Sequence, residues 1–296
     1  MSGEQDYIKL VAKVLDSGEL RETRNAKVYS LFGEHLEFKI NSLEKDNTFS
    51  YSIPRFTTKY ISFKNVFEEL IFFLNGETDS KKLENKGINI WKGNTSKEFL
   101  KSRNLDYSEG DMGPMYGFQW NHFGADYKGC DQDYKDQGIN QIDDCINLIK
   151  TDPMSRRIIF TALDPFNLNK MVLAPCHCVF QFYVRGGKYL DGQLYQRSAD
   201  LMLGVPYNVL SYSLLILMVA RQCNLHPGVL KITFGDVHIY SSHLEGAIEQ
   251  IRRKPGKEPV LFIKNEMNTP IRDYKLTDFV FESYVHQPVI KMKMIA

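Results

Sequence analysis

The stretch Leu173-Ala174-Pro175-Cys176-His177-Cys178-Val179-Phe180-Gln181-Phe182-Tyr183-Val184 places a thiol immediately before a run of alternating large apolar residues. Alternation with a period of two is typical of a strand, so residues 178–184 are predicted to form one. Pro175 stiffens the chain before the strand begins, and Cys176 is therefore expected at a sheet end with little freedom to move. That position suits a nucleophile. From this stretch alone, the alternative is that Cys176 is a small core hydrophobe.

A second polar stretch favours the catalytic alternative. Residues 196–208 read Gln-Arg-Ser-Ala-Asp-Leu-Met-Leu-Gly-Val-Pro-Tyr-Asn, so an arginine, a serine, an aspartate and an asparagine crowd together. They lead into residues 208–220, which are apolar almost all round and predict a central buried helix. Pro206 suits the first turn of that helix. A thiol and this polar cluster together indicate a reactive site rather than a core.

These two stretches resemble the signature of the thymidylate synthase family, in which a Pro-Cys-His nucleophile is followed by Gln-Arg-Ser-x-Asp and Leu-Gly-x-Pro-aromatic-Asn. Further motifs occur in the family's order and at about its spacing: Glu68-Glu69-Leu70, Gly87-Ile88-Asn89-Ile90-Trp91, Gly113-Pro114-Met115-Tyr116-Gly117, Asp152-Pro153-Met154-Ser155-Arg156-Arg157 and Asp236-Val237-His238-Ile239-Tyr240. Seven motifs in register are highly specific. No linker, repeat or low-complexity segment divides residues 1–296, which predicts one α+β domain. The resemblance implies a large mixed β-sheet covered by helices, with a sheet face at a dimer interface.

Composition predicts a globular protein without a strong overall electrostatic field. The 296 residues are 43% hydrophobic and 12% aromatic, which is ample for a core. Thirty-seven basic and thirty-six acidic residues leave a net charge of +1, so neither nucleic acid nor a membrane is indicated as a partner. The N-terminus does not resemble a signal peptide, and the apolar run 209–220 is too short to span a bilayer. We therefore expect a cytoplasmic protein.

The cysteines indicate neither a disulfide framework nor a metal site. They are odd in number and irregularly spaced: Cys130, Cys145, Cys176, Cys178 and Cys223. Cys176 and Cys178 could suggest a metal pair, but no second Cys/His pair completes a tetrahedral set.

Hydrophobic periodicity predicts the other elements. Helices are expected over residues 6–17 and 63–74, and a third should carry Ile139, Ile142, Ile146 and Ile149 and stop near Pro153. Strands are expected over residues 36–40, 158–162 and 229–240, and strand 178–184 should form a hairpin with 189–196. Residues 121–140 suggest a surface insertion, Ser242-x-x-Glu245 a capping box, and residues 289–296 a tail apolar enough to fold over a site.

Two adjacent glutamates in helix 63–74 face differently. At 100° per residue Glu69 lies at the edge of the apolar arc, between Val66 and Phe73, whereas Glu68 points away. A partly desolvated carboxylate has a raised pKa and can move protons near neutral pH, although an ion-paired boundary residue is the alternative. The family's general acid/base glutamate aligns with Glu69, the residue that helix geometry also selects.

The resemblance implies reductive methylation of dUMP to dTMP, in which 5,10-methylenetetrahydrofolate supplies the carbon and the hydride, without a metal. Cys176 would add to C6 of uracil and make C5 nucleophilic. Arg197 would activate the thiol and, with Ser198, bind phosphate. Charge developing on O4 needs a donor, and Asn208 offers a donor for O4 and an acceptor for N3–H. The alternative for Asn208 is a helix-start residue bonded to the backbone.

Other arginines are implied phosphate ligands. Arg156 and Arg157 cannot both bind one phosphate from a regular strand, so they must lie in an irregular lead-in. In the family both reach the phosphate of the neighbouring subunit, which implies an obligatory homodimer with shared sites. Arg24 is the best match for a further phosphate arginine, although residues 25–27 depart from the expected glycine-containing loop; Arg21 is its substitute. Solvated basic segments are the alternative for all of them.

The remaining roles also come from the resemblance. His238 and Tyr240 would hold the ribose 3′-hydroxyl, and Tyr116 would assist removal of the C5 proton. The folate surface would comprise Ile90, Trp91, Asn94, Asp200, Leu203, Gly204 and Tyr207, where Tyr207 replaces a more usual phenylalanine.

Two competing functions are weighed. A pyrimidine hydroxymethylase would use the same cysteine and folate but add water; Trp91 argues against it, because shielding the intermediate from water favours hydride transfer. A nucleotide- or RNA-binding regulator with an idle site would need the arginines, but not the thiol of Cys176 or the acid of Glu69.

Overall fold

The computed structural model describes residues 3–24, 26–45 and 48–295, and its strands form two sheets. The large sheet has seven strands in the order β1-β2-β9-β8-β7-β6, and β3 also pairs with β9. Its strands are β1 Glu19–Glu22, β2 Lys27–Phe32, β3 His35–Lys39, β6 Ile159–Thr161, β7 His177–Arg185, β8 Tyr189–Asp200 and β9 His226–Tyr240. The small sheet has the order β11-β10-β5-β4, from β4 Asn41–Lys45, β5 Thr48–Ser52, β10 Val260–Ile263 and β11 Phe279–Glu282.

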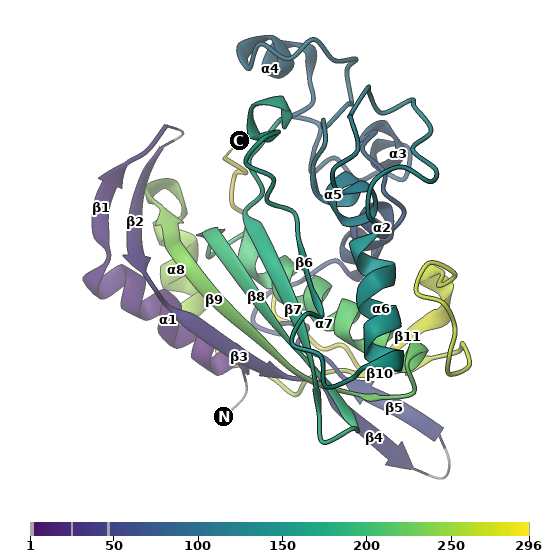
Figure 1. Ribbon diagram of the computed structural model, residues 1–296. Helices are drawn as coiled ribbons and strands as arrows, with labels where there is room; N and C mark the ends of the chain where they lie inside the picture. The colour runs from purple at the N-terminus through teal and green to yellow at the C-terminus, as the bar shows by residue number, and fades with distance from the viewer. Residues whose placement is uncertain (1–2, 25, 46–47, 296) are drawn as a thin grey trace.

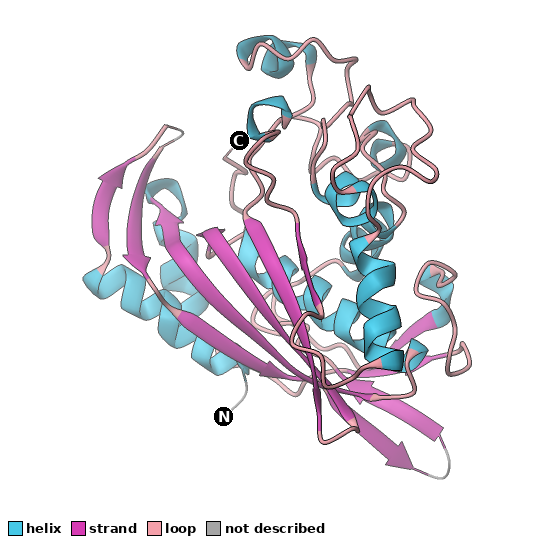
Figure 2. Cartoon of the chain, viewed as in Figure 1, coloured by secondary structure: helices cyan, strands magenta, loops and turns pink. Residues whose placement is uncertain are grey.

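Helices α1, α7 and α8 pack against the large sheet, as Figures 1 and 2 show. The α-helices are α1 Gly3–Ser17, α2 Phe63–Leu74, α3 Lys81–Glu84, α4 Lys97–Ser102, α5 Tyr116–His122, α6 Gln141–Thr151, α7 Gly204–Gln222 and α8 Leu244–Ile251. Short 3₁₀ turns lie at η1 Leu168–Lys170, η2 Ser241–His243 and η3 Leu276–Asp278. The α+β class with a large mixed sheet, expected from the sequence, is confirmed.

Helix α7 is the centre of the core. It connects β8 to β9, which run parallel, whereas β7 and β8 form the predicted antiparallel hairpin. A parallel pair needs such a crossover, and a helix is its usual form. By length and composition α7 could cross a membrane, but 78% of its apolar window is buried inside the protein. Its all-round hydrophobicity therefore reflects burial between the sheet and α2.

The opposite face of the large sheet exposes apolar side chains. Burial alternates along β7 and β8, with Phe180, Phe182 and Leu194 buried on the helix side. On the other side Tyr183 is 59% and Tyr195 is 43% exposed. Exposed aromatic residues grouped on a sheet face are typical of a surface that meets another protein.

Most predicted elements are confirmed with shifted ends. Helix α2 has the predicted bounds, whereas α7 begins four residues earlier than residue 208 and β6 is shorter than 158–162. Ile139 does not belong to the helix that follows it: it bridges to Phe123 and is 54% exposed.

The predicted capping box is wrong, whereas residues 121–140 are mostly exposed or partly exposed, as the predicted surface insertion requires. Ser242 lies within η2, and α8 begins at Leu244 with no side-chain capping bond from His243. The tight turn instead buries His243, whose Nε2 meets the backbone oxygen of Lys293 at 2.7 Å. Tyr134 anchors this insertion: it is buried and packs edge-on against Phe118.

Candidate active site

Strand directions bring the predicted site residues to one end of the large sheet. Because β7 is antiparallel to β8, its first residue, His177, pairs with Gln196 near the end of β8. Because β9 is parallel to β8, the two strands end together, with Asp200 opposite His238. The residue before β7 and the last residues of β8 and β9 therefore surround one space.

A cavity of about 640 Å³ occupies this sheet end. Eight of the predicted site residues line it: Arg24, Asn94, Cys176, Arg197, Ser198, Asp200, His238 and Tyr240. Ile295 lines it too, which confirms that the apolar tail folds over the site. The tail is held there partly by the bond between His243 and Lys293.

The backbone on both sides of Cys176 is fixed. Its N–H donates to the hydroxyl oxygen of Tyr116 at 2.9 Å, and its carbonyl accepts from the N–H of Arg197 at 2.9 Å. The guanidinium of Arg197 donates to the carbonyls of Pro175 at 2.8 Å and Ala174 at 2.7 Å. Arg197 thus stabilises the loop that presents the thiol, in addition to placing a positive charge in the cavity.

Two opposing effects act on the thiol of Cys176. Burial raises its pKa, and the nearby positive charge of Arg197 lowers it, with burial dominant. The expectation that Arg197 favours the thiolate is right in direction, but the net pKa is raised. Cys178 does not line the cavity: it is 3% exposed, and its Sγ contacts the carbonyl of Pro175 at 3.3 Å.

His177 supports the site from behind. Its ring stacks on that of Tyr116 with centroids 4.1 Å apart, and its Nδ1 lies 2.7 Å from the hydroxyl of Tyr212. Burial lowers the pKa of His177 to about 3, so the ring is neutral at physiological pH. His177 is not among the residues that line the cavity.

Glu69 lies behind the cavity, connected to it through aromatic residues. The indole Nε1–H of Trp91 donates to Glu69 Oε1 at 2.8 Å, and the ring centroids of Trp91 and Tyr116 are 6.0 Å apart. Burial raises the pKa of Glu69 to about 7, although the hydrogen bond from Trp91 opposes the shift. Glu68, which the helical periodicity placed away from the apolar arc, instead pairs with Lys86 at 2.5 Å. Only Glu69 is therefore poised to exchange a proton near neutral pH.

The turn between β8 and α7 is tightly specified. Asp200 Oδ1 accepts the backbone N–H groups of Met202 at 2.9 Å and Leu203 at 3.0 Å. Asn208, in the second turn of α7, accepts a hydrogen bond from Gln196 Nε2 at 3.1 Å through its Oδ1. Its recorded partner is thus a side chain rather than the backbone.

The predicted folate residues are partly buried around these groups. Ile90, Trp91, Leu203, Gly204 and Tyr207 all have intermediate exposure. Asn94 is 6% exposed, and within the described part of the chain its Nδ2 has no hydrogen-bond partner. A buried donor left open on a cavity wall fits a ligand with polar ring edges.

The predicted phosphate arginines separate into two groups. Arg24 lines the cavity, whereas Arg156 and Arg157 are exposed in a turn before β6. That turn is the irregular lead-in that the sequence required. Arg21, the proposed substitute for Arg24, instead pairs with Asp236 at 2.7 Å.

Two charged residues of the cavity were not indicated by the sequence patterns, Asp236 and Arg103. Asp236 begins one of the quoted motifs, and its period-two spacing from His238 could have placed it on the same face. Arg103 follows α4, and no pattern in the sequence connects it with the cavity. Its Nε is buried without a hydrogen-bond partner among the described residues.

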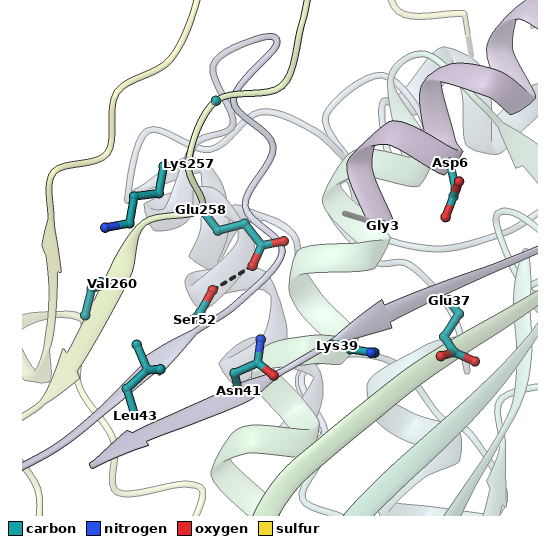
Figure 3. A pocket seen from close by; sticks show the side chains of 11 residues that line it. Gly3, Asp6, Glu37, Lys39, Asn41, Leu43, Ser52, Lys257, Glu258 and Val260 are labelled. Carbon is teal, nitrogen blue, oxygen red and sulfur yellow. Dashed lines mark hydrogen bonds between the residues drawn. The ribbon is translucent and has the colours of Figure 1, made fainter. Parts of the chain in front are cut away.

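A separate cavity of about 510 Å³ lies near the start of α1 and β3 (Figure 3). Its charged side chains have both signs, and Ser52 donates to Glu258 at 2.6 Å across one wall. It contains none of the predicted site residues. Over the described ranges, no group of three or more His, Cys, Asp or Glu side chains is arranged to hold a metal ion.

Comparison with known proteins agrees with this geometry. Residues 5–296 match the family model described as thymidylate synthase. The chain is 43% identical over 295 residues to "Thymidylate synthase 1/2" of Encephalitozoon cuniculi, covering 99% of this chain and 97% of the relative. It is 43% identical to the thymidylate synthase of Saccharomyces cerevisiae, covering 98% and 96%. It is also 43% identical to the bifunctional dihydrofolate reductase-thymidylate synthase of Leishmania major, of whose length it spans only 55%.

Proposed function

The chain belongs to the thymidylate synthase family, and from this premise we propose that it converts dUMP to dTMP, with 5,10-methylenetetrahydrofolate as co-substrate. The observation that carries the proposal is the fixed position of Cys176 in a cavity also lined by Arg197, Ser198 and His238. A thiol there can meet a base while arginine and histidine meet the phosphate and ribose. The co-substrate supplies the carbon and the hydride.

Covalent addition is the step assigned to Cys176. Its sulfur forms a bond to C6 of uracil, and the electron pair of the C5–C6 double bond moves toward O4. Arg197 favours the thiolate, because its positive charge lowers the thiol pKa against the effect of burial. Asn208 donates through its amide to O4, where negative charge develops, and accepts from N3–H.

Proton transfer is assigned to Glu69 and Tyr116. A carboxyl with a pKa of about 7 can both donate and accept a proton near neutral pH, because its two protonation states are then similar in free energy. Tyr116 uses its oxygen to accept from the backbone of Cys176, which leaves its O–H proton to face the reacting base or a water. Trp91 holds Glu69 and shields the space beside it from water, which favours hydride transfer over water addition.

Substrate binding is divided among the remaining side chains. Arg24, Arg197 and Ser198 take the phosphate, and His238 and Tyr240 take the ribose 3′-hydroxyl. The pterin lies against Trp91, Asn94 and Asp200, with the other folate contacts from Ile90, Leu203, Gly204 and Tyr207. The open Nδ2 of Asn94 supports this assignment.

We assign Arg156 and Arg157 to the phosphate site of a second copy of the chain. Both are exposed beside β6, at the edge of the sheet face where Tyr183 and Tyr195 are exposed. A homodimer formed through that face would bury the aromatic side chains and bring the arginine pair to the partner's cavity. The functional unit is then a cytoplasmic homodimer of single-domain subunits, with dUMP and folate as its ligands and no membrane or nucleic acid.

Product analysis tests the proposed function. The protein is incubated with dUMP and methylenetetrahydrofolate, and the nucleotide products are separated. Formation of dTMP together with dihydrofolate supports the synthase, because dihydrofolate appears only when the folate gives up its hydride. A 5-hydroxymethyl product with tetrahydrofolate would identify the hydroxymethylase instead. Unchanged dUMP, bound but not converted, would point to a regulator.

A further inference from the structure

Asp236 lines the cavity and contacts side chains of three strands, β1, β2 and β9. Its Oδ1 lies 2.7 Å from Nδ1 of His238, two residues further along β9. Its Oδ2 accepts from Arg21 Nη1 of β1 at 2.7 Å and from Ser30 Oγ of β2 at 2.9 Å. One carboxylate therefore connects the predicted ribose contact with both strands of the hairpin that carries Arg24.

The contacts fix the charge of this group. Burial alone would raise the pKa of Asp236, but hydrogen bonds from His238 and Ser30 and the charge of Arg21 outweigh it and lower the pKa. Asp236 is therefore ionised at neutral pH and can only accept hydrogen bonds. The ring nitrogen facing it must carry the proton, so Nε2 is the nitrogen of His238 left to meet a ligand.

The geometry points to Asp236 as a positioning residue for nucleotide binding, which sets the ring of His238 and fixes the hairpin that carries Arg24. This rests on the proposed function, because it takes the cavity's ligand to be a nucleoside monophosphate. The carboxylate acts on His238 directly and on Arg24 through the β1–β2 hairpin. Recognition of the ribose and of the phosphate is thereby coupled at one side chain.

The backbone around His238 does not depend on this carboxylate. The main chain of β9 is held by its ladder with β2, in which Ser30 lies opposite His238 and Phe32 opposite Asp236. On the other side, the carbonyl of His238 accepts from Leu201 N–H at 2.9 Å. We therefore expect Asp236→Asn to fold. The substitution should loosen the ring of His238 and the β1–β2 hairpin and leave strand β9 in place.

The test compares Asp236→Asn with Asp191→Asn, a matched control. Asp191 also accepts from an arginine, Arg185 Nε at 2.7 Å, and from the backbone N–H of Val229, but lies outside the cavity. Calorimetry measures binding of dUMP and of its 3′-deoxy analogue to each dimer. For Asp236→Asn we expect dUMP to bind about tenfold more weakly and KM to rise similarly, while kcat changes less than about threefold. The control should match the wild type.

Comparing dUMP with its 3′-deoxy analogue distinguishes a positioning role of Asp236 from a general disturbance of the site. Without a 3′-hydroxyl, the contribution made through His238 is absent, so the loss caused by Asp236→Asn should shrink to about threefold. An equal loss with both nucleotides, or a loss confined to kcat, would overturn the positioning role.

A spectroscopic measurement keeps the inference testable if the variant does not fold. Nitrogen-15 NMR of histidine-labelled wild-type protein should show His238 with its proton on Nδ1, and a neutral ring protonated on Nε2 alone would overturn the inference. Wild-type protein that binds dUMP but forms no dTMP would reject the proposed enzyme activity while leaving the comparison of the two nucleotides valid.

Discussion

The hydroxyl oxygen of Tyr116 accepts a hydrogen bond from the backbone N–H of Cys176 at 2.9 Å, although sixty positions separate them in the chain. Tyr116 begins α5, which belongs to the helical layer, and Cys176 immediately precedes β7 of the large sheet. The bond joins the side of the site that carries Glu69 and Trp91 to the side that carries the thiol. The proposed nucleophile and proton-transfer groups are thus held in one frame before any ligand binds.

The two cysteines beside β7 should behave differently when changed to serine. Cys176→Ser should keep dUMP binding and lose nearly all turnover, because the phosphate and base contacts remain while the nucleophile is gone. Cys178→Ser should keep most activity, because its Sγ is buried against the carbonyl of Pro175 and does not line the cavity. Calorimetry with dUMP and steady-state rates measure both effects. Similar losses of turnover in the two variants would contradict the assignment.

The raised pKa of Glu69 predicts a pH-dependent stability. The carboxyl titrates at 4.5 when unperturbed and at about 7 in the fold, so the folded state favours its protonated form. Its contribution to the free energy of unfolding is fully present below pH 4.5 and is lost as the pH rises through about 7. Above about pH 7, the buried ionised carboxylate of Glu69 lowers the free energy of unfolding by at most about 3 kcal/mol.

Glu69→Gln should remove that cost together with the proton-transfer group. Its free energy of unfolding should exceed that of the wild type at pH 8, but not at pH 4.5, while turnover falls sharply. Urea unfolding at both pH values measures this, and Glu68→Gln, which only removes the pair with Lys86, is the control. A stability difference independent of pH would show that Glu69 is not a titrating buried group.

Shared active sites predict complementation between two inactive proteins. In a hybrid of Cys176→Ser and Arg157→Ala subunits, one of the two sites contains both an intact thiol and an intact arginine. Random exchange should therefore restore up to about a quarter of wild-type activity. Activity is measured after mixing, and subunit exchange is verified by native mass spectrometry. Absence of recovery in verified hybrids would place Arg157 outside the partner's site.

Asn208 should determine the choice of base. Its amide can donate to O4 and accept from N3–H of uracil, whereas cytosine reverses both groups. Flipping the amide could satisfy cytosine in the ground state, but it would place the amide oxygen beside the group that needs a donor during reaction. The wild type should therefore strongly prefer dUMP over dCMP in kcat/KM.

Asn208→Asp should lose activity on dUMP and gain relatively on dCMP, because a protonated carboxyl can donate to N3 and accept from the amino group. The measurement is kcat/KM for both nucleotides with both proteins. An unchanged ratio in the variant, or a wild type that prefers dCMP, would mean that another residue reads the base.

Periodicity predicted the parts of the fold in which burial follows local pattern. Helix α2 and the hairpin of β7 and β8 have continuous apolar faces, so both could be placed from the sequence. Ile139 has the right spacing for α6 but lies in the preceding loop, because its partner Phe123 lies sixteen residues before it in the chain. Patterns within one element do not contain such contacts.

The site residues show the same contrast between what local sequence patterns predict and what depends on long-range contacts. Motifs indicated Cys176 and Glu69 as candidates, and helix geometry distinguished Glu69 from Glu68. They did not reveal that the pKa of Glu69 depends on Trp91, or that Arg21 is engaged by Asp236 across 215 positions. These are tertiary effects, and the residues that share them are not neighbours in any sequence motif.

The parallel pairing of β8 with β9 also determines the order in which the cavity can assemble during folding. The β7–β8 hairpin is local and can form early, whereas β9 must wait until the chain has passed through α7. Closing that loop costs chain entropy before the new strand adds contacts. We therefore expect nucleotide affinity to emerge late in refolding, after hairpin formation. A nucleotide present throughout should slow unfolding while leaving the first folding phase unchanged.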